Sequence, residues 1–257
     1  MMRQIFFVMT MLSLLFCSLF VFGGDDGAGL LARGDESFLR IDYPTAIAAY
    51  EESLVQHPLD AELLWRLARV YVCAGEVKEN GEGEPYFKKA EEYARRCIRL
   101  DSANAEGHTW LAATLGYLAL NAGIKDQVSI STELQSEVDK AIALDPANDA
   151  AYSIRGSLYR ALANVSWVQK QLAALFLGDL PDGGYAEAEA ALKKAVALAP
   201  DVMRHHYELG VLYVDWGKRK EARRAFEAAA ALPVRVAIDR PRLAKTKQFL
   251  ATLSDAE

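Results

Sequence analysis

The sequence predicts an all-α protein, an α-solenoid in which about five helical hairpins stack one after another. Three observations lead to this fold class: a composition rich in helix formers, apolar residues at helical spacing, and a pattern that recurs along the chain. The 257 residues include only 17 glycines and 8 prolines, and 52% are hydrophobic, which excludes collagen-like and disordered chains. Acidic residues outnumber basic residues 35 to 29, so no nucleic-acid partner is expected.

Residues 1–23 have the layout of a targeting segment. Arg3 precedes an apolar run over residues 5–22, and glycines and aspartates follow it. We expect a secretory signal peptide that is cleaved after Gly23. The alternative is an uncleaved N-terminal membrane anchor, because a run of this length is close to the shortest that spans a bilayer. The body of the chain is then either exported to the periplasm or anchored with its repeat domain on the non-cytoplasmic side.

The clearest repeating unit lies near the C-terminal end of the chain. A first helix carries an aromatic slot, a small residue and a tyrosine, and a second helix carries a small residue, an aromatic ring and a closing proline. These positions are His206, Leu209, Gly210, Tyr213, Ala222, Phe226 and Pro233. Small residues let two antiparallel helices approach closely, and the proline cannot continue the second helix. The spacing is typical of a tetratricopeptide repeat.

Four similar units precede this one, and a small residue late in each second helix measures their period. These residues are Ser53, Cys97, Ala141, Ala195 and Ala229. The intervals are 44, 44, 54 and 34 residues, so three of them exceed the tetratricopeptide period of about 34 residues. We therefore predict a solenoid over residues 27–236, with repeats at about 27–58, 61–102, 105–146, 149–200 and 203–234.

The extra residues are expected between the two helices of a repeat, where added length disturbs the stacking least. Residues 75–85 are polar and glycine-rich and predict a loop. Residues 121–131 are less polar and predict longer flanking helices. Residues 165–177 place apolar side chains on one helical stripe and predict an additional helix that docks on the solenoid. The alternative for this helix is a membrane-facing or partner-facing role.

A last helix is expected over residues 239–254, where Arg240 and Pro241 open it. Its apolar side is formed by Leu243, Phe249, Leu250 and Leu253. Because a solenoid needs an element that shields its last hydrophobic face, this segment is predicted to be a capping helix.

Two of the insertions resemble those of the regulator of microtubule dynamics proteins. The first combines residues 122–125 with residues 141–146, and the second begins at Trp167, runs to Phe176 and continues in residues 185–188. The resemblance covers about residues 30–253 and implies an all-helical adaptor without enzymatic activity.

Animal members of this family are described as associating with microtubules. A secretory start places this chain where microtubules are absent, and its composition, rich in alanine, leucine and arginine, suggests an exported bacterial relative. Microtubule regulation is therefore only a remote alternative.

No pattern in the sequence predicts a catalytic site, a cofactor or a metal. His205 and His206 are adjacent, so on a helix they point about 100° apart and cannot bind one ion together. His206 and His108 occupy the aromatic slot of their repeats and are interpreted as packing residues. A phosphate-binding glycine loop and a nucleophile elbow are both missing. The protein is therefore not expected to be an enzyme.

Cys73 and Cys97 are expected to remain free, buried thiols. Cys73 ends a first helix, whereas Cys97 lies inside the antiparallel second helix. Their offset along the helix axis is roughly 10 Å, which exceeds the span of a disulfide.

The concave face, which the first helices should line, is the expected binding surface. Aromatic, arginine and serine side chains occupy its exposed positions: Trp65, Arg69, Ser157, Arg160, Arg204 and Tyr207. Such a mixture suits an extended peptide or a helix that carries some negative charge. The alternative is that these residues are ordinary solvated side chains.

These observations predict a non-enzymatic protein-interaction scaffold of the cell envelope, which binds a segment of a protein or peptide partner in its groove. The alternative is a membrane-anchored structural or adaptor protein that uses residues 5–22 and the helix that begins at Trp167.

Overall fold

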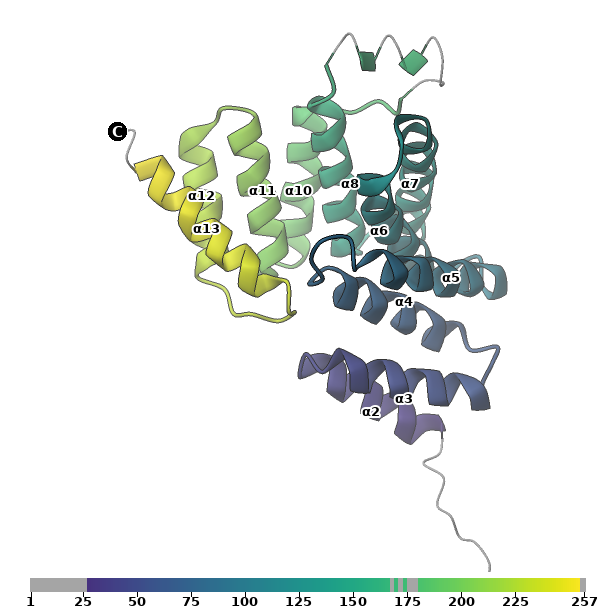
Figure 1. Ribbon diagram of the computed structural model, residues 1–257. Helices are drawn as coiled ribbons and strands as arrows, with labels where there is room; N and C mark the ends of the chain where they lie inside the picture. Colours follow the sequence, from purple (N-terminus) through teal and green to yellow (C-terminus); the bar gives the residue numbers. More distant parts are fainter. Residues whose placement is uncertain (1–26, 167–168, 171–172, 175–179, 255–257) are drawn as a thin grey trace, which may run out of the picture.

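The computed structural model describes residues 27–166, 169–170, 173–174 and 180–254. These residues form helices and no strand, and the helices stack in chain order along a bent array (Figure 1). The predicted all-α solenoid is therefore confirmed.

The helices pair into hairpins, and each hairpin stacks on the next mainly through contacts of its second helix with the following first helix. Consecutive contacts join α2 to α3, α4 to α5, α6 to α7, α8 to α10 and α11 to α12. The first helices α4, α6, α8 and α11 also contact one another in turn, and α13 packs on α11 and α12. The helix bounds are α2 Gly27–Leu39, α3 Tyr43–Gln56, α4 Ala61–Gly75, α5 Glu84–Leu100, α6 Ala105–Asn121, α7 Ile124–Leu144, α8 Asp149–Ala163, α10 Tyr185–Leu198, α11 Met203–Asp215, α12 Arg219–Ala230 and α13 Asp239–Ser254.

The turns that lead from one hairpin to the next explain where the first helices begin. Asn104 caps α6 by accepting a hydrogen bond from the Gly107 backbone N–H at 2.8 Å. Asn148 caps α8 by accepting a hydrogen bond from the Ala151 backbone N–H at 2.9 Å. Asp60 caps α4 by accepting from the backbone N–H of Glu62 at 2.8 Å. Each cap satisfies a backbone donor that the helix itself leaves unpaired. These polar turns therefore fix the start of each inner helix.

A close approach between a glycine and a bulky side chain holds three of the hairpins together. A Cβ atom added at Gly34 would lie 2.3 Å from the Tyr50 ring, and one at Gly210 would lie 2.6 Å from the Phe226 ring. The two residues of each pair are 16 positions apart in sequence. In each case the absent side chain of glycine makes room for the larger one.

The hairpin with the longest insertion has the same close approach. A Cβ atom at Gly156 would lie 2.5 Å from Leu192, although these two residues are 36 positions apart. The additional positions lie between α8 and α10, as the repeat pattern predicts. The small residues that measured the period, Ser53, Cys97, Ala141, Ala195 and Ala229, are at most 1% exposed.

Two of the three insertions lie within the described chain. Residues 76–83 form the loop between α4 and α5, as expected. The second insertion lengthens the helices on either side of it, as predicted, because α6 has 17 residues and α7 has 21, compared with 13 and 14 for α2 and α3. Most of the predicted helix over residues 165–177 lies outside the described residues, and so does the expected targeting segment.

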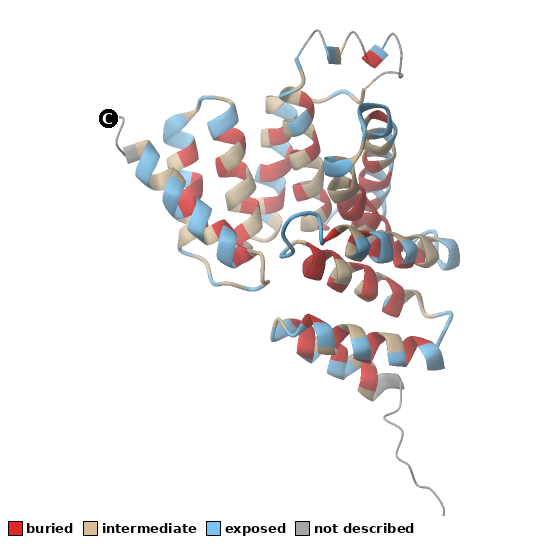
Figure 2. Ribbon diagram, in the orientation of Figure 1, coloured by how far each residue is buried: buried red, intermediate tan, exposed pale blue. Residues whose placement is uncertain are grey.

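The C-terminal helix covers the end of the array. Phe249 of α13 stacks on Phe226 of α12, with ring centroids 4.7 Å apart. Leu250 and Leu253 pack against the same hydrophobic cluster, and buried residues concentrate on the faces between neighbouring helices (Figure 2). No helix in the described part of the chain is long and apolar enough to cross a membrane.

We predict that replacing Gly210 with alanine lowers the free energy of unfolding by about 1–3 kcal/mol, because the new methyl group collides with the fully buried Phe226 ring. Gly116→Ala in α6 is the matched control, since its Cβ would lie 3.6 Å from Leu134, an ordinary contact. Alanine there should be neutral or stabilise the helix by up to about 1 kcal/mol. Urea unfolding of both variants measures the difference. Equal free energies of unfolding for the two variants would contradict the claim that the Phe226 ring leaves no room for a side chain at position 210.

Candidate functional site

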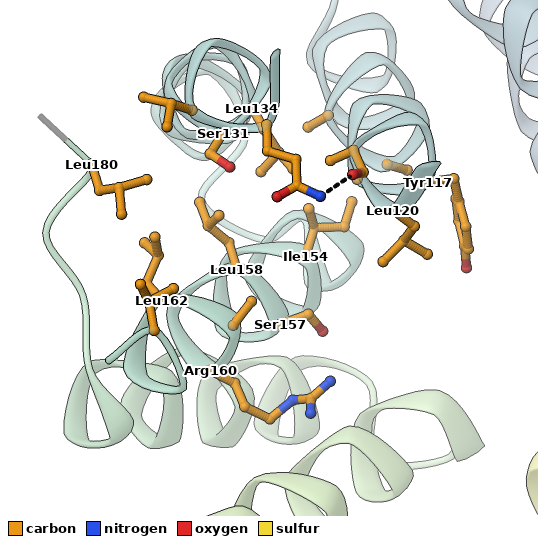
Figure 3. Close-up of a pocket in the computed structure, with 18 of the residues that line it drawn as sticks. Tyr117, Leu120, Ser131, Leu134, Ile154, Ser157, Leu158, Arg160, Leu162 and Leu180 are labelled. Carbon is orange, nitrogen blue, oxygen red and sulfur yellow. Dashed lines mark hydrogen bonds between the residues drawn. The ribbon is translucent and has the colours of Figure 1, made fainter. Parts of the chain in front are cut away.

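A cavity of about 890 Å³ lies between α6, α7 and α8. Its walls are mainly apolar, and Figure 3 shows Leu134 of α7 and Leu158 and Leu162 of α8 around one space, with Leu180 on its far side. Cavities that bind ligands are typically about 300–1,000 Å³ and mostly apolar. The size and lining of this cavity are therefore those of a binding site.

The apolar surface continues outside the cavity at the turn between α6 and α7. Leu120 and Ile124 line the cavity, yet they are 74% and 72% exposed. Large apolar side chains that rim a cavity and stay exposed are typical of surfaces that a partner covers. The cavity and its rim together form a continuous apolar surface, which we call the α6–α8 site.

Charged side chains gather at one end of the α6–α8 site. Arg160 of α8, Arg204 and Glu208 of α11, and Arg242 of α13 are the charged residues of its lining. Arg160 pairs with Asp215 at 2.9 Å and lies 3.6 Å from Glu208. Three cations and one anion therefore face the cavity.

Two of these arginines share one buried carboxylate. Glu76 follows α4, and its side chain is 1% exposed. Its Oε1 atom accepts hydrogen bonds from Arg204 and from the Tyr117 hydroxyl, and from Arg242 at 3.4 Å. Burial by itself would lower the pKa of Arg204, but the Glu76 carboxylate and nearby groups raise it above its usual value. Arg204 therefore stays charged beside the cavity.

The segment between α12 and α13 closes part of the concave face. Ala237 donates its backbone N–H to the Tyr43 hydroxyl at 2.9 Å, and Val236 and Ala237 pack against the hydrophobic cluster of the first hairpins. Arg242 adds its contact with Glu76. The C-terminal segment therefore bridges to the first two hairpins across the inner side of the array, next to the α4–α5 loop (Figure 1).

The structure brings together three of the six residues that the sequence predicted for the groove. Ser157, Arg160 and Arg204 all line the α6–α8 site. Ser157 donates a hydrogen bond to Glu208 at 3.3 Å.

The other three predicted residues lie elsewhere. Trp65 and Arg69 belong to a cluster on the first two hairpins, where the Arg69 guanidinium lies 4.0 Å from the Phe38 ring centroid and 5.0 Å from that of Trp65. Tyr207 packs its ring near Phe226, with centroids 6.1 Å apart. The six residues therefore do not form one site, and partner binding by the groove stays a prediction.

The sequence did not identify several residues of the site. The arrangement of Glu76 and Arg242 depends on contacts between repeats that are far apart in sequence. Leu120 and Ile124 lie on either side of the turn at residues 122–123, so two large apolar residues beside a short turn were the available signal.

His108 and His205 are buried and have structural partners. His108 is 3% exposed; its Nδ1 lies 2.5 Å from Glu137, and its Nε2 donates to the Ser102 carbonyl at 3.1 Å. His205, and not His206 as expected, is the buried histidine of its pair. Within the described ranges, no group of three or more His, Cys, Asp or Glu side chains is placed to hold a metal ion.

Both cysteines of the described chain are free and buried, as the sequence predicted. Burial raises the pKa of each thiol, Cys73 and Cys97, to about 12. Such thiols are poor nucleophiles at neutral pH.

The family model described as regulator of microtubule dynamics protein 1-3 matches residues 30–254. Regulator of microtubule dynamics protein 2 of Rattus norvegicus is 26% identical over 196 residues, which are 76% of this chain and 48% of that protein. Regulator of microtubule dynamics protein 3 of Bos taurus is 31% identical over 180 residues, 69% of this chain and 38% of that protein. The chain thus spans half or less of the length of these relatives.

A solved structure has the same fold. It is a thermophilic TPR protein of Thermus thermophilus, which superposes with a TM-score of 0.65 at 20% identity and covers 86% of this chain and 99% of its own. At this identity the similarity establishes the tetratricopeptide fold and nothing about the partner.

We predict that Glu76→Ala lowers the free energy of unfolding by about 3–5 kcal/mol, because it leaves the largely buried Arg204 without its carboxylate and leaves Arg242 with Asp239 alone. Glu79→Ala in the same loop is the matched control, since this residue is exposed, and it should change stability by less than about 0.5 kcal/mol. Thermal and urea unfolding measure both. A small effect at Glu76 would mean that the carboxylate does not hold the inner side of the array together.

Proposed function

The chain belongs to the regulator of microtubule dynamics family, and from this membership and its cavity we propose that it is a non-enzymatic protein-interaction scaffold. The α6–α8 site binds an apolar segment of a partner protein. The observation that carries this proposal is the continuity between the apolar cavity and the exposed Leu120 and Ile124 at its rim.

The extent of the apolar surface supports a protein partner over an enclosed small molecule. A molecule held inside the cavity would leave Leu120 and Ile124 in water, whereas a partner segment that enters the cavity would cover them. The packed helices around the site, of which α6 and α8 are capped by Asn104 and Asn148, also favour binding, because little conformational entropy is lost on the side of the scaffold.

We further propose that the scaffold works in the cell envelope, exported to the periplasm or anchored there by residues 5–22. The support is the charged start, apolar run and glycines of residues 1–24, whose layout is that of a signal peptide.

The names of the mammalian relatives favour a second candidate, regulation of microtubules in a eukaryotic cytoplasm. The two candidates differ in the compartment of the mature protein. Cell fractionation with N-terminal sequencing tests them together, and a new N-terminus near Gly24 in the periplasmic or secreted fraction is the result we expect. An intact N-terminus in the membrane fraction favours the anchored form. A cytoplasmic protein that sediments with microtubules would support the second candidate instead.

We predict that a photo-crosslinking amino acid at position 120 captures a defined segment of one partner protein in living cells. Position 59 is the matched control, because Leu59 is 77% exposed and Leu120 is 74% exposed, but Leu59 lies away from the α6–α8 site. Mass spectrometry identifies the adducts. The same set of adducts from both positions, or adducts from neither, would contradict the proposal.

The captured segment also allows a quantitative check. Leu120→Asp should weaken its binding about tenfold or more, because a leucine side chain that becomes buried contributes about 1.5–3 kcal/mol. Leu59→Asp should leave the affinity unchanged, and both variants should keep their helicity in circular dichroism. The double variant Trp65→Ala, Arg69→Ala distinguishes the sites: loss of binding there would favour the groove of the first hairpins.

A further inference from the structure

We infer that the partner segment carries an acidic side chain, which pairs with Arg204 at the charged end of the α6–α8 site in competition with the protein's own Glu76. The inference rests on the proposed function, because it names the chemistry of the segment that the same site would bind.

The charges that a bound segment could reach favour an acidic group. Arg160, Arg204 and Arg242 line the cavity with a single carboxylate, Glu208. Glu76 lies behind the arginines and is not part of the lining, and its side chain is 1% exposed. A carboxylate that enters through the cavity therefore meets guanidinium groups first, and arginine binds carboxylates with good geometry.

The hydrogen-bonding capacity of Arg160 is not fully used. The Nε atom of Arg160 is buried and has no hydrogen-bond partner among the described residues, and the same holds for Oε2 of Glu76. Arg160 is 25% exposed and contacts Asp215 and Glu208 through its terminal nitrogens. A donor without an acceptor at the end of an apolar cavity is costly unless a ligand or water satisfies it.

Polar side chains along the walls favour a peptide as the occupant. Ser131 of α7 and Ser153 of α8 stand among the apolar residues of the lining. Gln127 and Ser157 stand there too; they donate to the Ala119 carbonyl and to Glu208, and their oxygen atoms can accept from a ligand. A peptide main chain has N–H and C=O groups that need partners when they leave water, whereas a hydrocarbon chain has none. The combination of apolar walls, hydroxyl and amide groups, and arginines at one end therefore fits an apolar segment that ends in glutamate or aspartate.

Exchange of carboxylates on Arg204 leaves Glu76 paired. Glu76 also accepts from Tyr117 and from Arg242, so it keeps two donors when Arg204 turns to the partner. The internal carboxylate keeps Arg204 charged and paired in the free protein, and because it competes for Arg204 it lowers the affinity of the site for acidic segments. Glu76 is therefore an internal competitor that limits how tightly an acidic segment binds.

Two pools of short synthetic peptides test this inference. They share the same random apolar and serine positions and differ only in one residue near the C-terminus, which is glutamate in one pool and glutamine in the other; both pools are amidated. We expect the intact protein to retain the glutamate pool about tenfold more strongly, as a charge-assisted hydrogen bond predicts. Arg204→Gln should remove this preference, and Arg160→Gln should reduce it. Arg235→Gln is the control, because Arg235 is 50% exposed and pairs with Asp201 outside the cavity.

The competition is tested with Glu76→Gln, which keeps the shape of the side chain but removes its charge. This variant should retain the glutamate pool several-fold more strongly and the glutamine pool unchanged, with helicity verified by circular dichroism. If the Glu76 variant does not fold, Arg160→Gln, which lies outside the Glu76 contacts, still tests whether the site prefers an acidic side chain.

Equal retention of the two pools, retention of neither, or preferential binding of anionic phospholipid vesicles over both pools would overturn the inference. Crosslinking from position 120 decides the proposed function separately. If a partner is captured there while the two pools bind equally, the proposed scaffold function is supported. Only the inference that the partner segment carries an acidic side chain is then contradicted.

Discussion

The rest of the structure depends on the close contact between the two helices of each hairpin. Gly34, Gly156 and Gly210 each face a bulky side chain that leaves no room for a Cβ atom. Because the contact fixes the distance between the helices, it also fixes where the next hairpin stacks, and insertions are tolerated only between the paired positions. The two residues are 16 positions apart in two of these pairs and 36 positions apart in the third, and the close contact is present in all three.

A linear array of this kind leaves its inner side open unless something bridges it. In this chain the C-terminal segment reaches the first hairpin through Ala237 and Tyr43, and Glu76 joins α11 and α13 to the end of α4. This bridge occupies the part of the concave face where a peptide groove was expected. The open apolar surface lies instead on α6, α7 and α8. The exposed Leu120 and Ile124 stand on either side of the turn between the lengthened α6 and α7.

The fold was predictable because the contacts within a hairpin are local in sequence and repeat with a measurable period. The burial of Ser53 and Ala229 and the lengthened α6 and α7 follow from that period, and the capping helix follows from the hydrophobic face that the last repeat leaves open. The site was only partly predictable. Ser157, Arg160 and Arg204 were found from their repeat positions, but repeat position alone cannot show that Arg204 pairs with Glu76, 128 residues away. Such contacts depend on how the whole array brings distant repeats together.

The central claim is that a partner binds the α6–α8 site and not the face of the first hairpins. Hydrogen–deuterium exchange of the full protein, with and without the partner segment captured by crosslinking, tests it most directly. The account predicts slower exchange in residues 116–131 and 153–162 on binding, and no change in α4 around Trp65. Protection confined to α4, with unchanged exchange in α6, α7 and α8, would contradict it.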